Sequence, residues 1–275
     1  MADEQQDPCP GPLLIIGGHE DKDGERAILK ALARLVGERR LVIATVASHE
    51  PDGYLEAYQD AFRDLGVTDL VELYVEERGD SARDEALRKL DGAGGVFFTG
   101  GDQLRISSQI GDTPLERRIL ELHAQGLPIA GTSAGAAVMS ETMLVKGPNA
   151  TSYRIGELHM APGLGLMRDV IIDQHFAERG RYGRLLGAVA HNPRLLGVGI
   201  DENTALLVEN GCGTVLGEGA VYVVDGHGAS HSNIAEEEAE RALSIFDVRM
   251  HVLSSGDEFD FERRRPKSGK HWDDR

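Results

Sequence analysis

Cysteine, aromatic side chains and basic charge are all scarce in this chain. Its two cysteines, Cys9 and Cys212, cannot build a disulfide framework or a cysteine-type metal site, so we expect a reducing, cytoplasmic location. Lysine and arginine total 29 against 46 acidic residues, which gives a formal net charge of −17. This balance argues against a general binder of nucleic acid or anionic membranes, and it is compatible with a cationic or zwitterionic substrate.

Long apolar runs are missing as well. No apolar run approaches the length of a membrane-spanning helix. Residues 1–7 are acidic and polar, whereas a secretory signal would begin with basic residues and continue with an apolar stretch. We therefore expect no membrane association.

Short apolar segments alternate with amphipathic ones over the first half of the chain. The apolar runs predict strands, and the helical spacing of apolar residues between them predicts helices. Ser81 is expected to cap one of these helices. The expected strands are 13–16, 41–46, 71–75 and 95–98, and the expected helices are 25–36, 54–65, 81–90, 102–110 and 114–125. This order predicts an α/β fold with a three-layer, doubly wound, mostly parallel sheet. Ligands bind such a sheet at the carboxyl ends of its strands.

The second half predicts further strands and fewer helices. Segments 169–173 and 195–200 are expected to be strands, and residues 144–165 to be long loops near the site. Short strands with hairpin-like turns indicate an antiparallel extension at one sheet edge, at 205–208, 213–216, 220–224 and 248–253. We expect a flexible N-terminus over residues 1–12, a single α/β domain over 13–261 and a charged, disordered tail over 262–275.

A serine between two glycines stands at the centre of the chain. Gly131-Thr-Ser-Ala-Gly135 follows an apolar run at 128–130 and precedes a helix-compatible run at 134–139. This is the pattern of a nucleophile elbow, in which a tight turn exposes the serine hydroxyl and backbone N–H groups can stabilise an oxyanion. A plain turn of small residues fits the same pattern. A catalytic role for Ser133 therefore requires a base and an orienting acid elsewhere in the chain.

Candidates for the base and the acid follow later strands. His175 comes directly after the strand at 169–173. The strand at 195–200 ends in Asp201 and Glu202, either of which could orient an imidazole, and spacing does not choose between them. Three arginines at helical spacing after His175 could clamp carboxylates or form a solvated helix face, namely Arg179, Arg181 and Arg184.

Two glycine pairs also follow strands. Gly17-Gly18 lacks the Gly-x-Gly-x-x-Gly spacing of a dinucleotide loop, and charged residues follow it, so we expect no nucleotide cofactor. Gly100-Gly101 could supply oxyanion donors, with Gln103 bonding a substrate, or it could be a plain turn with Asp102 as the helix N-cap.

The order of the parts excludes one large hydrolase class. In α/β-hydrolases the acid precedes the histidine, whereas here the histidine comes before the acid. The alternative bases would be His227, His231 or His251, and none of them follows a parallel-type strand.

Four motifs taken together resemble the cyanophycinases, over about residues 13–224. These motifs are Phe98-Thr-Gly-Gly-Asp-Gln103, Gly131-Thr-Ser-Ala-Gly-Ala136, Asp173-Gln-His-Phe176 with the three arginines, and Gly199-Ile-Asp-Glu-Asn-Thr-Ala205. The resemblance implies a serine-type exopeptidase that cuts cyanophycin into β-Asp-Arg dipeptides. Cyanophycin is a polyaspartate backbone with an arginine on each side-chain carboxyl. The fold would resemble aspartyl dipeptidases and class I glutamine amidotransferases.

The resemblance also implies roles for individual residues. Ser133 would be the nucleophile, His175 the general base and Glu202 the orienting acid. By analogy with other elbows, the N–H groups of Ala134 and of the Gly101 turn would form the oxyanion hole. The substrate pocket would contain Gln103, Asp173, Gln174, Arg179, Arg181 and Arg184. We expect a homodimer that needs no metal and no cofactor. The alternatives are an aspartyl dipeptidase acting on free α-Asp-X dipeptides and a non-catalytic binding protein on the same fold.

Overall fold

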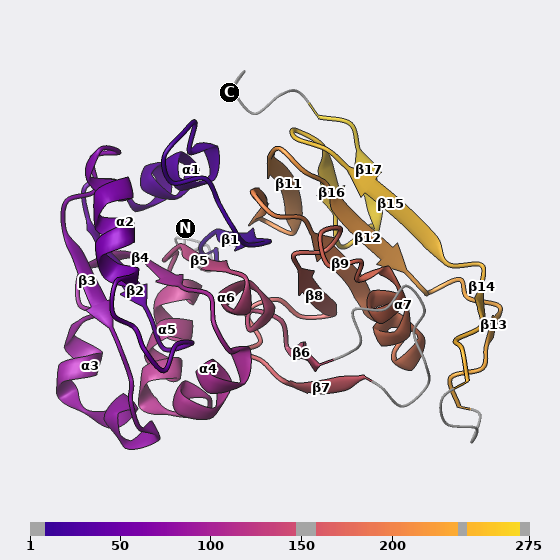
Figure 1. Ribbon diagram of the computed structural model, residues 1–275, viewed down its shortest axis with the longest axis horizontal. Helices are drawn as coiled ribbons and strands as arrows, with labels where there is room; N and C mark the ends of the chain where they lie inside the picture. Colours follow the sequence, from indigo (N-terminus) through magenta and orange to yellow (C-terminus); the bar gives the residue numbers. More distant parts are fainter. Residues whose placement is uncertain (1–8, 147–157, 236–240, 270–275) are drawn as a thin grey trace, which may run out of the picture.

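The computed structural model describes residues 9–146, 158–235 and 241–269, in which most strands belong to two sheets (Figure 1). The larger sheet has nine strands in the order β17-β16-β11-β10-β1-β5-β4-β2-β3. Five neighbouring strands are parallel: β1 (Leu13–Ile16), β5 (Ile129–Thr132), β4 (Ala93–Phe98), β2 (Arg40–Ala44) and β3 (Leu70–Leu73). Four antiparallel strands continue the sheet beyond β1: β10 (Thr204–Glu209), β11 (Cys212–Gly217), β16 (Glu258–Asp260) and β17 (Arg265–Lys267). The predicted α/β fold is confirmed.

A second sheet contains the strands that precede His175 and Glu202. Its order is β15-β12-β9-β8, with β8 and β9 parallel. The strands are β8 (Val170–Gln174), β9 (Leu196–Ile200), β12 (Val221–Asp225) and β15 (Arg249–Leu253). The expectation that one sheet holds all the parallel strands is therefore wrong. Strand β10 lies antiparallel along the edge of β1, so that edge cannot accept another parallel strand. An apolar pattern predicts that a strand forms, but it does not specify the neighbour with which the strand pairs.

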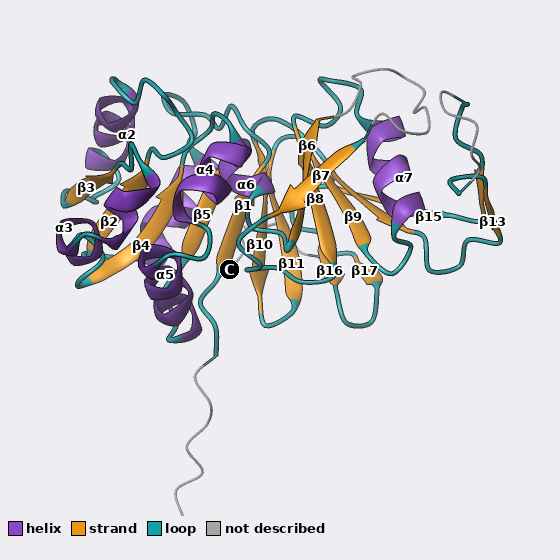
Figure 2. Cartoon of the chain, turned by 90° about the horizontal axis from the view of Figure 1, so that it is seen from below, coloured by secondary structure: helices purple, strands orange, loops and turns teal. Residues whose placement is uncertain are grey.

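Helices cover both faces of the nine-stranded sheet, as Figures 1 and 2 show. Along β1, alternate side chains belong to two different cores, as a strand period of two requires. One core is closed by α1 (Ala27–Val36) and α2 (Tyr54–Arg63). The other core contains residues of α4 (Gln103–Ile110) and α5 (Pro114–Ala124) and of the second sheet. Helix α7 (Tyr182–His191) packs against the second sheet, and the short helices are α3 (Asp84–Arg88) and α6 (Ala134–Ala137).

Three local expectations are wrong. Ser81 does not cap a helix but lies within the 3-10 helix Arg78–Ala82, where its hydroxyl donates to a carbonyl of the same turn. The expected loops at 144–165 contain the strands β6 (Thr142–Lys146) and β7 (His159–Pro162), and the segment 149–153 lies outside the described residues. The tail expected to be disordered contributes β17, and its last six residues are also outside the described part. A further pair is β13 (His231–Ser232) with β14 (Ile245–Phe246).

Backbone hydrogen bonds join the two sheets at one edge. The His175 N–H donates to the carbonyl of Gly17 over 2.8 Å, and the Asn203 N–H donates to Gly18 over 2.9 Å. The Ser133 N–H donates to Ile16 over 3.0 Å. The segments that follow β1, β5, β8 and β9 therefore meet at a single place, although they belong to different sheets. Within the described residues, no helix combines the length and apolar character that crossing a bilayer requires.

Candidate active site

Ser133 has a backbone conformation that few serines adopt. It lies between β5 and α6 with φ 54° and ψ −110°. The glycines on either side are sterically required. A Cβ on Gly131 would lie 2.3 Å from the Gly135 carbonyl oxygen, and a Cβ on Gly135 would lie 2.3 Å from that of Phe98. Helix α6 is shorter than the predicted 134–139, since it ends at Ala137. The small residues thus hold the serine in a sharp strand–helix turn.

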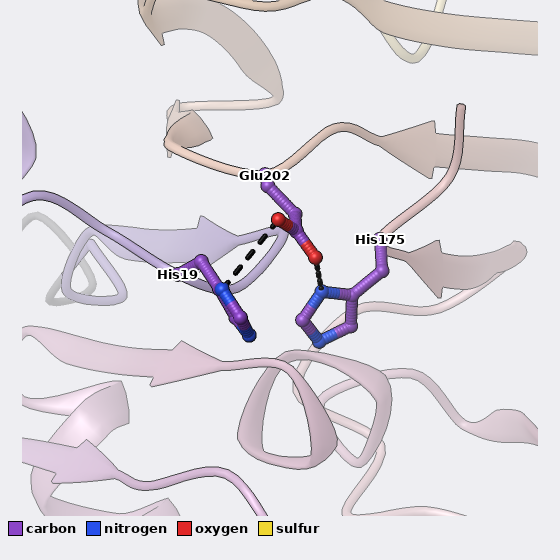
Figure 3. A group of neighbouring side chains, drawn as sticks. All are labelled: His19, His175 and Glu202. Atoms are coloured by element: carbon purple, nitrogen blue, oxygen red, sulfur yellow. Dashed lines mark hydrogen bonds and ion pairs between the residues drawn. The ribbon is translucent and has the colours of Figure 1, made fainter. Parts of the chain in front are cut away.

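His175 bridges the hydroxyl of Ser133 and a carboxylate. Its Nε2 is 2.9 Å from Ser133 Oγ. Its Nδ1 is 2.6 Å from Glu202 Oε1, the contact drawn in Figure 3. Asp201, the other acid that spacing allowed, accepts instead from the N–H groups of Ala177 and Ala220. An imidazole placed in this way can take a proton from the hydroxyl while the carboxylate stabilises the charge that develops.

Burial lowers the pKa of His175 below its ordinary value, and nearby charges modify the effect. The hydrogen bond that His175 Nδ1–H donates to Glu202 raises this pKa, whereas the positive charge of Arg179 lowers it further. His175 is 2 % exposed, which explains why desolvation is the largest cause. The imidazole is therefore mainly neutral at pH 7, as a general base has to be.

Backbone N–H groups near Ser133 have no protein acceptor among the described residues. They include those of Ala134, the first residue of α6, and of Gly101 in the turn after β4. That turn lies against the serine, because a Cβ on Gly100 would be 3.5 Å from Ser133 Cβ. The Gly101 backbone has φ 141°, and a Cβ there would lie 2.4 Å from the Ala47 carbonyl oxygen. Asp102 caps α4 by accepting from Leu104 N–H, so the turn has a capping role as well.

An open cavity of about 840 Å³ lies over these groups. Of the predicted pocket residues, five line it, namely Gln103, Gln174, Arg179, Arg181 and Arg184. Gln103 donates its amide to the carbonyl of Leu144 over 2.8 Å, which fixes the orientation of its side chain. The structure thus brings together residues from segments that are far apart in the sequence.

Asp173 does not line the cavity but lies behind the wall formed by Arg179, Arg181 and Arg184. Its side chain is 1 % exposed, and its carboxylate accepts from Arg181 over 3.1 Å and from both Nε and Nη2 of Arg184. The expected direct contact between Asp173 and a substrate is therefore not what the structure describes, since both oxygens are occupied by arginines. Its observed role is to hold two buried guanidinium groups in place.

The three arginines do not form one helix face. Helix α7 begins at Tyr182, so Arg179 and Arg181 precede it and only Arg184 lies within it. Arg179 is exposed, whereas Arg181 and Arg184 are buried at 6 % and 5 % exposure. Burial, together with the neighbouring Arg184 and Arg179, lowers the pKa of Arg181 to about 10 in spite of Asp173. The alternative of a solvated helix face is wrong for the two buried arginines.

A buried carboxylate, Glu20, also lines the cavity although no motif points to it. Its oxygens accept from Thr132 and Tyr58, each over 2.5 Å, and Lys22 lies 3.0 Å away. Burial raises the pKa of Glu20, but Lys22 and the two hydroxyls outweigh this and keep the pKa below its usual value. Its position directly after β1, at the ligand edge of the sheet, was the available signal. By accepting the hydrogen bond from Thr132, Glu20 fixes the side chain of the residue that precedes Ser133.

This chain matches one protein-family model and is similar to several known proteins. Residues 13–216 match the model of peptidase family S51. A cyanophycinase of Synechococcus elongatus is 41% identical over 251 residues, which cover 90% of this chain and 78% of the relative. A cyanophycinase of Geminocystis herdmanii is 37% identical over 261 residues, which cover 94% and 96%. The crystal structure of a peptidase from an acI-B1 actinobacterium aligns with TM-score 0.65 at 22% identity, over 89% of this chain and 98% of that one, and supports the fold.

Proposed function

The chain belongs to peptidase family S51, and on that premise we propose that it is a cyanophycinase, a serine exopeptidase that releases β-Asp-Arg dipeptides from cyanophycin. Membership of the family makes it a peptidase, which confirms the predicted class of hydrolase and the resemblance to cyanophycinases. The observation that carries the mechanism is the continuous contact from Ser133 Oγ through His175 to Glu202, over 2.9 and 2.6 Å.

The chemistry proposed is acyl transfer to the serine. His175 Nε2 takes the proton of Ser133 Oγ as this oxygen attacks the backbone amide carbon between two aspartates. The Ala134 and Gly101 N–H groups donate to the oxyanion. Protonated His175 then gives its proton to the leaving amine as the C–N bond breaks. Water, deprotonated by the same imidazole, hydrolyses the acyl-enzyme. Glu202 keeps the proton on Nδ1, so that Nε2 remains the acceptor.

The charges around the cavity fit the two ends of a β-Asp-Arg unit. Arg179, Arg181 and Arg184 offer positive charge for its carboxylate, with Gln103 and Gln174 as hydrogen-bonding neighbours. Asp21 and Asp23 also line the cavity and offer negative charge for its guanidinium. Backbone N–H groups of the same loop lower the pKa of Asp21 to about 2, so this carboxylate is ionised at all relevant pH values.

Incubation with insoluble cyanophycin tests the proposal. The supernatant is analysed by mass spectrometry, and the expected product is β-Asp-Arg. Cleavage of free α-Asp-X dipeptides without attack on the polymer would make the protein an aspartyl dipeptidase instead. Activity on neither substrate would favour the non-catalytic binding protein. The homodimer and the cytoplasmic location remain predictions, and size-exclusion chromatography with light scattering tests the first of them.

The pH dependence of kcat/KM follows from the lowered pKa of His175. The base is active when neutral, so the rate falls as the pH falls through this pKa. Because burial places the pKa below the ordinary value of about 6.5, we expect full activity at pH 7 and half-maximal activity at a pH below about 6.5. Hydrolysis rates of a soluble β-Asp-Arg oligomer between pH 4.5 and 8 measure this pH dependence. An acid limb with its midpoint above pH 7 would contradict the description of His175 as a desolvated base.

A further inference from the structure

A second histidine lies against the carboxylate of Glu202. His19 Nδ1 is 3.5 Å from Glu202 Oε2, while Oε1 of the same carboxylate faces His175 Nδ1 at 2.6 Å. Figure 3 shows the two imidazoles side by side, each directing a nitrogen toward the carboxylate. The three residues offer ligand atoms that all lie within 4.8 Å of one another. We propose that His19, His175 and Glu202 form a binding site for a zinc-class divalent cation, which inhibits the peptidase reversibly.

The separations suit a tetrahedral ion. Ligand atoms about 2.0–2.2 Å from a tetrahedral metal lie roughly 3.3–3.5 Å from one another. The 3.5 Å between His19 and Glu202 already has this value. The short hydrogen bond between His175 and Glu202 has to open, with loss of its proton, and the His19 ring has to bring its nitrogen within reach of the same ion. The His19 side chain is 70% exposed, so it can rotate to complete the site without disturbing a packed core.

The set of donors selects the metal. Two imidazole nitrogens and one carboxylate form a common three-ligand zinc site and leave the fourth position free for water. Mg²⁺ prefers an octahedral shell of oxygen atoms, so it should not compete. The site therefore distinguishes Zn²⁺ from Mg²⁺ by ligand chemistry and coordination geometry, since the two ions carry the same charge.

The backbone holds the three ligands in register. Gly17 accepts from the His175 N–H and Gly18 accepts from the Asn203 N–H, which ties the His19 loop to the segments of both other ligands. The Asn203 side chain accepts in turn from the Asp21 N–H over 2.9 Å. A Cβ on Gly18 would lie 2.3 Å from the His175 ring, so only glycine lets the loop approach this closely. These bonds fix the positions from which the ligands reach the ion, which reduces the ordering cost of binding.

The surrounding charges are mixed. Glu20, Asp21 and Asp23 line the same cavity and favour a cation, as does the net charge of −17. Lys22 and the three arginines of the wall oppose it, and Arg179 acts directly on His175. The opposing charges weaken the site, so we expect an exchangeable ion that a chelator removes.

Inhibition follows from the chemistry of the two ring nitrogens. A metal on Nδ1 of a neutral imidazole forces the remaining proton onto Nε2. The Nε2 that faces Ser133 then carries a proton and cannot accept another from the hydroxyl. The metal also takes the carboxylate that orients the ring. The inhibition rests on the proposed Ser133–His175–Glu202 triad, whereas binding of the metal ion does not depend on it.

Isothermal titration with Zn²⁺ tests the binding without any substrate. We expect saturable binding of one ion to the wild-type protein, prepared without a histidine tag, and none of Mg²⁺. His19→Gln should bind Zn²⁺ at least about tenfold more weakly, because it removes a ligand. His227→Gln, which alters an exposed histidine outside the cavity, should bind as the wild type does. Absence of saturable binding, or equal affinity in His19→Gln, would overturn the site.

Titration of the hydrolysis rate with Zn²⁺ tests the inhibition. Each variant is compared with its own metal-free rate, and EDTA should restore that rate. The half-inhibitory concentration should rise at least about tenfold in His19→Gln and remain unchanged in His227→Gln. Binding without inhibition would overturn the link to the triad and leave the site standing. If the protein had no peptidase activity on any substrate, the calorimetry would still decide the metal site.

Discussion

Replacement of Ser133 by alanine is expected to lower kcat by about 10⁴- to 10⁶-fold and to leave the fold unchanged. The variant lacks the hydroxyl oxygen that contacts His175 Nε2, so no acyl-enzyme can form. The methyl group of alanine fits wherever the serine Cβ does, so no packing is lost. Release of β-Asp-Arg from cyanophycin, followed by mass spectrometry, measures the loss.

Ser108→Ala is the matched control. Ser108 is exposed on α4, and its hydroxyl donates to a carbonyl of its own helix. This variant should keep the wild-type rate within about twofold. Circular dichroism and thermal denaturation should give the same curves for the wild type and both variants. If Ser133→Ala retained more than 1% of the wild-type rate, Ser133 would not be the nucleophile.

Removal of the buried carboxylate of Asp173 is expected to destabilise the protein by about 3–5 kcal/mol. Asp173→Ala would leave the guanidinium groups of Arg181 and Arg184 buried without their counter-charge. The cost of an unpaired buried charge exceeds that of a lost surface pair several times. Urea denaturation followed by circular dichroism measures the free energy of unfolding.

A carboxylate directly before the start of the same strand supplies the control. Asp169 precedes β8, is largely exposed and pairs with Arg194 over 3.5 Å. Asp169→Asn should change stability by less than about 0.5 kcal/mol, and asparagine tolerates the positive φ of this residue. Asp173→Ala should also raise KM, because its two arginines lose their fixed positions. Equal stability of Asp173→Ala and the wild type would show that the arginines are held by other groups.

The arginine wall illustrates a limit of pattern reading. Arg179, Arg181 and Arg184 are spaced as on a helix, yet the helix begins only at Tyr182. Hydrogen bonds of Arg181 to Asp173 and Gln174 hold it before the helix starts. Helix propensity is a weak prior that such tertiary bonds override.

Glu20 and His19 illustrate a second limit. They follow the first strand and lie at the predicted ligand edge, but their contacts are with Thr132, Tyr58 and Glu202, which are distant in the sequence. No local pattern encodes a hydrogen bond to a residue over a hundred positions away. Their roles become visible only when the loops are placed together.

What the sequence by itself determined is the local chemistry: the strands and helices, and the glycines that leave room for Ser133 between them. Periodicity and steric limits act over a few residues, so they can be seen in the order of the amino acids. Only the tertiary structure decided that β8 and β9 form a separate sheet and that Asp173 faces two arginines. Spacing left Asp201 and Glu202 open and only the family resemblance implied Glu202, which in the structure is the acid in contact with His175. Each of these depends on which free edge or charge is nearest after the chain has folded, and apolar pattern alone carries no information about that choice.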